Sequence, residues 1–499
     1  MLPFLHGIAA ASTPRNDERD RDCHSPSTEL AMTIKNMKNS IKTYNQVTQF
    51  IESLSNIAPL QKDKTVKTAK ERLENVKRFL EFLGNPEKKL KIIHVAGTSG
   101  KGSVVTMLHS ILDEAGKKVG SYTSPHTTTY CERIKIGNKY ISEKELVETT
   151  NFLKNKMDEY TYNLQPTTYN LSLNFFEFSF CLAVYYFSQQ NCKYAVIETG
   201  CGGRYDASNA IKKPTYTIIT NIGRDHLDIF GSLENIAKEK AGIIKKNTPC
   251  LTGETDRRWL GFFKKEFSLL HCYIFTLLKK INYKDLKNVK TSLDGTSFEY
   301  KNKKYKLQMI GAHQARNATL AIECINNLQL SGAKYSIVKK GLEKAFYPAR
   351  MEVIQKNPTI IIDGAHNSDK LKACFEFIKN QESGIRNKGK KYLILGMAKN
   401  KKIKNISKLF NFFDKVYLTR FSNPFRKVIN YNDWMTIFAK KPKNDIYYKH
   451  YAKDALLDIL PKLRKNDLLV ITGSIFLAGE MREYWYNTEE IVRRRKSKW

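Results

Sequence analysis

The stretch that decides the fold runs from Ile92 to Ser103 and has the sequence IIHVAGTSGKGS. Its apolar first half predicts a buried strand, and its second half combines glycines with a lysine and hydroxyl side chains. A helical pattern follows from Val104 to Ala115. Glycines let backbone N–H groups converge on anionic oxygens, and the N-terminus of a helix adds positive potential. We therefore predict that this loop binds the phosphates of a nucleoside triphosphate.

The predicted phosphate-binding set is a run of consecutive residues: Gly97, Thr98, Ser99, Gly100, Lys101, Gly102 and Ser103. Lys101 supplies a positive point charge, and Ser103 lies where such a loop places the hydroxyl that holds Mg²⁺. The spacing differs from the Walker form, because only Thr98 and Ser99 separate Gly97 from Gly100. The sequence thus predicts a nucleoside triphosphate with Mg²⁺.

Length and composition indicate a folded chain of more than one domain. With 499 residues the chain is too long for a single hydrophobic core, and 41% of its residues are hydrophobic. The 84 basic and 49 acidic residues give a net charge of +35, which suits anionic partners. The lysines are scattered among asparagines and form no arginine stripe interleaved with aromatics, so we expect no nucleic-acid partner.

The cysteines and the apolar runs bear on the compartment. The chain has nine cysteines, an odd number without a paired Cys-x-x-Cys spacing, which argues against a disulfide framework or a zinc site. No apolar run reaches the length that spans a bilayer. We therefore expect a cytoplasmic protein, monomeric and without a membrane partner, that acts on small molecules.

The order of the apolar segments divides the chain into four parts. Residues 1–40 are polar and mixed in charge and predict a disordered extension rather than a targeting leader. Residues 41–305 alternate helical patterns with short apolar runs, which predicts a parallel-sheet ATPase domain carrying the phosphate loop. Residues 311–485 predict a smaller, Rossmann-like α/β domain with four to five strands. Residues 486–499 form a basic tail, and we expect its last part, Arg493–Trp499, to be mobile.

Several apolar runs end in glycine, acidic or histidine residues. The predicted strands are 131–136 at an edge of the sheet, and 194–198, 216–220, 359–362, 392–395, 416–418 and 468–471. Because ligand groups gather at the carboxyl ends of parallel strands, the residues that follow these runs are candidates for the site.

The order of these motifs resembles one family, the folylpolyglutamate synthase/dihydrofolate synthase branch of the Mur-ligase superfamily. The resemblance covers residues from about 41 to about 485, in the same order across both predicted domains. The matching segments in the first domain are His94–Ser103, Thr123–His126, Glu132–Ile134, Phe176-Glu177, Glu198–Asn209, Asp225-His226 and Glu239–Ile243. Those in the second are Gly311–Gln314, Asn317-Ala318, Arg350–Glu352, Asp363–Asn367 and Thr472–Ser474.

The resemblance implies ATP-dependent amide ligation. A carboxylate of folate or dihydropteroate would attack the γ-phosphate to give an acyl phosphate, and the amine of L-glutamate would then displace phosphate. Phosphoryl transfer depends mainly on positioning and charge neutralisation, so a lysine, backbone N–H groups and a divalent cation are suitable parts. The resemblance leaves a dependence on K⁺ open.

The resemblance also implies roles for individual residues. In the first domain Ser124, Glu177 and His226 would coordinate Mg²⁺, and Lys240 matches a lysine that is carbamylated in relatives and supports the acyl phosphate. With Lys101 and Lys240, His366 completes the predicted catalytic set. The remaining residues belong to the second domain as predicted: Asn317 near the adenine, Arg350 at the phosphates, Asp363 at the ribose, and His366 where that domain closes over the site.

Two segments depart from the pattern of the family. Ala349 stands where the family often has a glycine, and Lys399–Lys402 replaces the usual acidic segment. The pterin-facing loop Thr123–His126, with Tyr130 and Glu132-Arg133, favours a bifunctional enzyme that also accepts dihydropteroate. Two alternatives stay open: an amino-acid ligase of cell-wall synthesis, and a basic phosphate-loop protein that binds RNA without ligase activity.

Overall fold

The computed structural model describes residues 40–55, 66–163, 173–270, 278–380, 389–399, 410–422, 427–437 and 445–498. The predicted disordered extension over residues 1–40 lies outside the described residues, apart from Ser40. All the helices and strands below belong to one compact unit, Thr43–Trp499.

The first sheet is built around β1, the strand that leads into the glycine-rich loop. Its order is β4-β3-β2-β5-β1-β6-β7-β8, and all neighbouring pairs are parallel except those made by β3 and β4. The strands are β1 (Lys91–Ala96), β2 (Val119–Tyr122), β3 (Ile134–Ile136), β4 (Lys139–Tyr140), β5 (Tyr194–Glu198), β6 (Tyr216–Ile219), β7 (Cys250–Thr252) and β8 (Leu278–Lys280). The carboxyl ends of β1, β5 and β6 therefore meet at one edge.

The edge strand predicted at 131–136 is shorter than expected. Tyr130–Arg133 forms a 3-10 turn, and the strand begins at Ile134. The reason is local: the Glu132 carboxylate accepts the backbone N–H groups of Thr127 and Thr128, which bends the chain back on itself.

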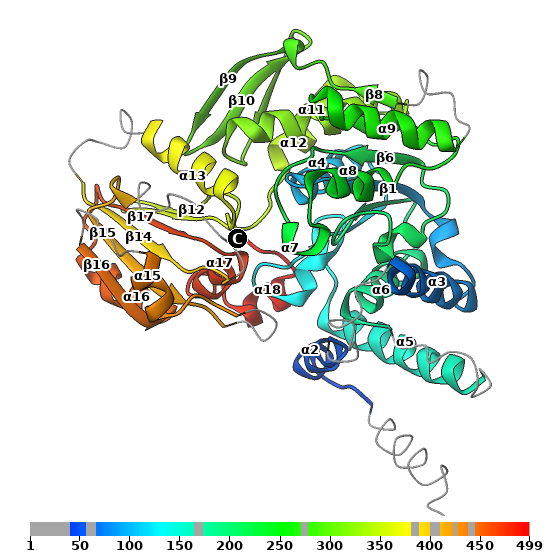
Figure 1. Cartoon of the computed structure of the whole chain (residues 1–499), viewed down its shortest axis with the longest axis horizontal. Helices are drawn as coiled ribbons and strands as arrows, with labels where there is room; N and C mark the ends of the chain where they lie inside the picture. Colours follow the sequence, from blue (N-terminus) through cyan, green and yellow to red (C-terminus); the bar gives the residue numbers. More distant parts are fainter. Residues whose placement is uncertain are drawn as a thin grey trace, which may run out of the picture. The chain divides into compact units, whose positions relative to one another are not determined.

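Helices cover both faces of this sheet, and β1 is therefore buried on both sides. On one face, Ile93 and Val95 pack against the apolar residues of α4 (Lys101–Glu114). On the other, Ala96 packs with residues of α8 (Leu233–Ala241) and α9 (Arg257–Leu269). The remaining helices of this part are α2 (Tyr44–Ser53), α3 (Val66–Phe82), α5 (Glu143–Asn163), α6 (Phe175–Gln189) and α7 (Leu227–Phe230) (Figure 1).

A small antiparallel sheet and two helices extend the core beyond α4. The sheet has the order β11-β10-β9, with β9 (Leu286–Ser292), β10 (Gly295–Tyr300) and β11 (Lys303–Leu307), and the helices are α11 (Ala312–Asn327) and α12 (Tyr335–Lys344). Both helices share the apolar core of α4, and the Ser110 hydroxyl of α4 donates to the Gly341 carbonyl of α12 at 2.7 Å. We therefore propose a domain boundary between α12 and β12 (Glu352–Lys356), later than residues 305–311, where the sequence pattern placed it.

The second sheet has six strands in the order β12-β13-β17-β14-β15-β16, more than the four to five predicted. They are β12, β13 (Thr359–Ile362), β14 (Lys391–Leu395), β15 (Lys415–Arg420), β16 (Asp445–Tyr451) and β17 (Leu468–Thr472), all parallel to their neighbours except β12. α13 (Ser368–Asn380) packs on one face, and α16 (Ala452–Ile459) and α17 (Ile475–Arg482) pack on the other (Figure 1). α15 (Tyr431–Ile437) lies between β15 and β16 in the chain. The predicted fold class, two successive α/β domains, is confirmed.

The basic tail differs from the prediction of a mobile end. Residues Thr488–Arg494 form α18, and Ser497 beyond it is only 4% exposed. The basic side chains of α18 point to solvent, but the residues after the helix are held by hydrogen bonds to the first domain. The run of basic residues was therefore a poor predictor of whether this segment is ordered in the folded protein.

Candidate active site

The glycine-rich loop joins β1 to α4 in a conformation that only glycine accepts at two positions. Gly97 and Gly100 have φ values of 144° and 85°. A Cβ atom at Gly97 would lie 1.7 Å from the Thr220 hydroxyl oxygen, and one at Gly100 would lie 2.4 Å from the Asn317 side-chain oxygen. The loop is thus pressed between the end of β6 and α11, which places the predicted adenine residue Asn317 directly against the phosphate loop.

The lysine of the loop faces an acid that sequence reasoning gave no role. Lys101 Nζ lies 3.9 Å from Glu198 Oε1, at the end of β5, and Glu198 Oε2 accepts the Ser124 N–H at 3.1 Å. Burial raises the pKa of the Glu198 carboxyl, and the positive charge of Lys101 opposes that rise. The signal was present in the sequence, since Glu198 ends an apolar run that pairs with β1.

The predicted metal ligand Glu177 is engaged by an arginine. Arg72 of α3 donates to both Glu177 oxygens, from Nε at 2.7 Å and from Nη2 at 2.5 Å. Glu177 also forms a capping box with Asn174 at the start of α6. Burial raises the pKa of Glu177, and the Arg72 hydrogen bonds oppose that rise. Sequence reasoning missed Arg72, because a helical pattern shows which face is apolar but not which polar residue meets a partner 105 positions away.

Lys240 lies on α8 with 4% of its surface exposed. The glycine loop after β5 packs against this helix so closely that a Cβ at Gly203 would lie 2.6 Å from the Glu239 carbonyl oxygen. Burial and the positive charge of Lys101 lower the pKa of the Lys240 ammonium to about 7. The acids Asp206 and Asp225 oppose that shift. The structure therefore brings the two predicted catalytic lysines into one electrostatic neighbourhood.

His366 of the second domain meets Asp225 of the first. Its Nε2 lies 3.4 Å from Asp225 Oδ2 and 3.2 Å from Lys370 Nζ, and its Nδ1 lies 3.0 Å from the Gly364 carbonyl oxygen. Nδ1 carries a proton, because a carbonyl can only accept, and a hydrogen bond from Nε2 to Asp225 requires a second proton on the ring. Burial works to raise the pKa of the Asp225 carboxyl, but the His366 hydrogen bond and the Lys370 charge hold it well below its usual range.

The predicted metal ligand His226 stands beside this pair. It occupies the N-cap of α7 with a left-handed φ of 56°, and its backbone N–H reaches Asp225 Oδ1 at 3.1 Å. A non-glycine residue held in this region stores strain of the kind found at functional sites. His226 is thus at the strand-end position predicted for it, although its role as a ligand stays a prediction.

Arg350 and Asp363 lie together at the start of the second domain. A Cβ at Gly364 would lie 2.6 Å from Arg350 Nη1, so the guanidinium is seated over that glycine. The Asp363 oxygens accept the N–H groups of Met351 and Ala365 at 2.8 and 3.0 Å, which leaves lone pairs for a further donor such as a ribose hydroxyl. Ala349, in place of the glycine of the family, has a φ of 50°, the left-handed conformation that glycine adopts most readily.

The donor set fits a cation that is bound mainly through oxygen. The Ser124 backbone is bonded to the Glu198 carboxylate, while both Glu177 oxygens are bonded to Arg72, and Mg²⁺ usually takes one or two protein carboxylates together with phosphates and waters. No cluster of three or more histidine, cysteine, aspartate or glutamate side chains is found in the part of the chain that the structure describes. Ser103, on α4, is buried.

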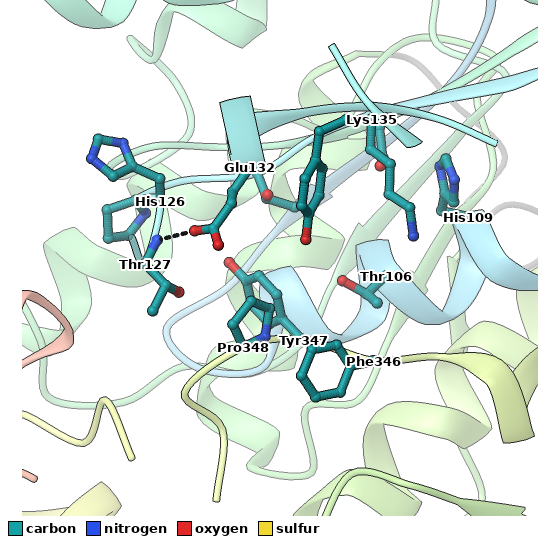
Figure 2. Close-up of a pocket in the computed structure, with 13 residues that line it drawn as sticks. Thr106, His109, His126, Thr127, Glu132, Lys135, Phe346, Tyr347 and Pro348 are labelled. Carbon is teal, nitrogen blue, oxygen red and sulfur yellow. Dashed lines mark hydrogen bonds between the residues drawn. The ribbon is translucent and has the colours of Figure 1, made fainter. Parts of the chain in front are cut away.

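A small pocket lies beside the loop that carries Ser124, whose neighbours Thr123 and Pro125 line it. Its lining includes Thr106, Thr123, His126, Glu132 and Tyr347. Figure 2 shows the Glu132 carboxylate and the Tyr347 side chain among the lining residues, with the Thr127 N–H bonded to Glu132. Among the described helices, none is both long and apolar enough to cross a membrane.

Comparison with known proteins places the chain. Residues 95–325 match the Mur ligase middle domain, and residues 349–475 match the Mur ligase glutamate ligase domain. The dihydrofolate synthase/folylpolyglutamate synthase of Bacillus subtilis is 31% identical over 82% of this chain and 94% of its own length. The crystal structure of the folylpolyglutamate synthase from Thermotoga maritima is 27% identical, with a TM-score of 0.66 over 92% of this chain and 97% of its own.

A second solved structure carries a nucleotide. The folylpolyglutamate synthase of Mycobacterium tuberculosis complexed with ADP is 25% identical to this chain, with a TM-score of 0.71 over 83% of this chain and 94% of its own. Its likeness, like the others, spans both α/β domains rather than the phosphate loop alone. The chain therefore belongs to the folylpolyglutamate synthase/dihydrofolate synthase family of Mur ligases.

Proposed function

We propose that the protein is an ATP-dependent ligase that joins L-glutamate to the carboxylate of folate or dihydropteroate through an acyl phosphate. The observation that carries the proposal is the meeting of Lys101, buried Lys240 and the Asp225–His366 pair at the carboxyl ends of β1, β5 and β6. A lysine and backbone N–H groups at a phosphate loop suit a reaction whose transition state carries spread negative charge.

Each group has a task in this reaction. The loop N–H groups and Lys101 bind the triphosphate, and Arg350 reaches it from the second domain. Ser124 and Glu177 would hold Mg²⁺, which would supply charge neutralisation to the phosphates. Glu198 holds the Lys101 side chain and the Ser124 backbone in place relative to each other. When neutral, His366 Nε2 accepts from Lys370, and when protonated it donates to Asp225, so the ring can hold a proton near the reacting groups.

A carbamate on Lys240 would supply an additional acid at the site. With its pKa near 7, Lys240 is largely a neutral amine in mildly alkaline solution, and a neutral amine can attack CO₂. The attack forms an N–C bond and releases one proton. The product would carry a negative charge near Lys101.

We further propose that the enzyme accepts both dihydropteroate and folate. The loop from Thr123 to His126 that motivates this proposal is held by Arg133, whose Nε donates to His126 Nδ1 at 2.9 Å. The Arg133 guanidinium lies 5.0 Å from the centre of the Phe175 ring. A loop fixed on both sides suits recognition of a flat, rigid ligand.

We also propose that the enzyme is a cytoplasmic monomer. The described cysteines are all free thiols.

Phosphate release by the purified protein with MgATP and L-glutamate tests the function. Dihydropteroate and tetrahydrofolate are compared as acceptors. The wild type is compared with Lys101→Ala, and Lys118→Ala, which changes an exposed lysine on the loop after α4, is the control. Release with both acceptors is expected, and with tetrahydrofolate alone the enzyme would only extend folates. Release with neither acceptor, in a protein that is folded and binds MgATP, would refute the proposal.

A further inference from the structure

The last residues described, 495–498, form a segment that we call the C-terminal strap. It crosses from the second domain to the edge of the first sheet. Tyr140 of β4 donates its backbone N–H to the Arg495 carbonyl at 2.9 Å, and Arg495 Nε returns a hydrogen bond to the Tyr140 carbonyl at 2.6 Å. Arg495 also pairs with Glu145 at 3.0 Å, and Lys498 lies over the Phe346 ring. The strap is thus attached along its length rather than at one point.

Ser497 of the strap enters a buried polar cluster. Its hydroxyl lies 2.8 Å from Glu132 Oε1 and 2.6 Å from the Tyr140 hydroxyl. Because a carboxylate accepts, Ser497 donates to Glu132 and Tyr140 donates to Ser497. All three side chains are less than a tenth exposed, at 4%, 7% and 8% respectively for Ser497, Glu132 and Tyr140. A hydrogen bond to a buried charge is stronger than a neutral one, and losing it leaves a lone pair unsatisfied.

The other Glu132 oxygen holds the loop of the active site. Oε2 accepts the N–H groups of Thr127 and Thr128, each at 2.8 Å, which fixes the end of the loop that begins at Ser124. Figure 2 shows this carboxylate between the loop and the pocket. Ser497 therefore acts on the loop indirectly, because its hydroxyl orients Glu132 and Glu132 in turn orients the loop.

The same strap is tied to the segment that carries Arg350. Arg482 of α17 donates to the Ser497 carbonyl and forms a two-pronged ion pair with Glu352, at 2.8 and 3.1 Å. Glu352 Oε2 also accepts the Ala349 N–H at 2.9 Å, next to Arg350. Arg482 and Glu352 are 0% and 4% exposed, so this pair is shielded from solvent.

A backbone contact brings α17 onto the same loop. A Cβ at Gly479 would lie 1.8 Å from the Thr127 carbonyl oxygen, so the helix and the loop touch main chain to main chain. The loop is consequently held from two directions, by Glu132 from within the first domain and by α17 from the second. The strap joins these two supports.

We propose that the C-terminal strap is a working part of the ligase, and that Ser497 is a positioning residue that joins the Ser124–Thr128 loop to the Arg350 segment. The proposal rests on the function proposed above, because it assigns the loop and Arg350 to one reaction. Its chemical basis is the unbroken buried path Thr127–Glu132–Ser497–Arg482–Glu352–Ala349. Neither domain contains that path by itself, so the two halves of the site are aligned by the end of the chain.

The test compares Ser497→Ala with Ser497→Thr in the full-length protein. Without the hydroxyl, we expect kcat/KM for the ligation to fall about tenfold, mostly through kcat, since misplaced groups slow the reaction more than they weaken binding. Threonine keeps the hydroxyl and should restore most of the activity. Arg493→Ala, which removes a charge from exposed α18, is the matched control and should stay at the wild-type rate.

Hydrogen exchange supplies a readout that needs no turnover. Amide exchange in a peptide covering Thr127 and Thr128 should be faster in Ser497→Ala than in the wild type and Arg493→Ala, with exchange in β1 and β5 unchanged. Tyr140→Phe, a milder change, should shift the same amides in the same direction. Wild-type rates and exchange in Ser497→Ala would overturn the proposal, and so would a loss of protection spread over the whole chain. A wild-type protein without turnover would refute the proposed function alone, because the exchange result would still decide the role of the strap.

Discussion

At the scale of single residues, the site depends on charges whose ionisation the fold controls. Lys101 and Lys240 have the same kind of side chain, but of the two only Lys240 is buried. Burial and the positive charge of Lys101 together lower the pKa of the Lys240 ammonium to about 7. For Glu198 the two effects act against each other: burial raises the pKa of its carboxyl, and the positive charge of Lys101 opposes that rise. We therefore propose Lys101 as the phosphate-binding lysine, while Lys240 is available as an amine.

The lowered pKa of Lys240 predicts a carbamate that depends on pH. The group loses its proton as the pH rises through about 7, so the neutral amine that reacts with CO₂ predominates at pH 8 and is scarce at pH 6. With ¹³C-bicarbonate we expect a carbamate resonance at pH 8 that weakens toward pH 6, and ligation that rises with added bicarbonate.

The exposed lysine on the same helix gives the control for this prediction. Lys240→Gln should lack the resonance and most of the activity. Lys238→Gln, which removes a surface ion pair with Glu234 and a cation–π contact with Phe262, should keep both. An unmodified Lys240 in fully active enzyme would show that the lysine acts as a simple cation.

At the scale of secondary-structure elements, α3 and α6 are joined by one ion pair at the edge of the site. Arg72 satisfies both oxygens of Glu177, whose side chain is 8% exposed, while the Arg72 side chain is 18% exposed. Removing one partner of such a pair leaves an uncompensated charge in a poorly solvated place. The pair therefore both secures α3 and aims the carboxylate that we propose as a metal ligand.

Arg72→Ala should lower the free energy of unfolding by about 2–3 kcal/mol, less than for a fully buried pair because Arg72 keeps some contact with water. Lys70→Ala removes an exposed charge from the same helix and should change stability by less than about 0.5 kcal/mol. The measurement is urea unfolding followed by circular dichroism. Adding Glu177→Gln to Arg72→Ala should recover part of the stability, and a double variant no better than Arg72→Ala would contradict the account of an unpaired charge.

At the scale of the whole molecule, the site is complete only where the two α/β domains meet. Asp225 and Lys240 come from the first domain, and His366, Lys370 and Arg350 come from the sequence after α12. The α11 and α12 helices, which the sequence pattern assigned to the second domain, share the core of α4 and so carry Asn317 to the phosphate loop.

His366→Ala should separate nucleotide binding from ligation. The phosphate loop lies in the first domain, so we expect the KM for MgATP to stay within about twofold while kcat falls at least tenfold, because His366 orients Asp225 across the domains. Initial rates at saturating glutamate provide the measurement. His450→Ala, at an exposed position on β16, should behave as the wild type, and an equal rise in the KM for MgATP with unchanged kcat would assign His366 to nucleotide binding instead.

The sequence alone identified what depends on local order along the chain. The strand, glycine loop and helix around Lys101 follow from residue types at fixed spacing, because strand burial, glycine conformations and helix periodicity are local properties. The family and the two-domain α/β class followed from the order of such segments. Strand ends were candidate positions because the ends of parallel strands share one edge of a sheet, whereas the roles predicted for individual residues came from the resemblance to the family.

Only the tertiary structure decided which partners those residues meet. Glu198 with Lys101, Arg72 with Glu177, and His366 with Asp225 are pairs far apart in sequence, and no periodicity encodes such contacts. The tail shows the limit most clearly: its basic composition suggested a mobile end, yet Ser497 is buried against Glu132. Composition describes what a segment would do in water, whereas its order depends on whether the folded protein offers a surface that satisfies its polar groups.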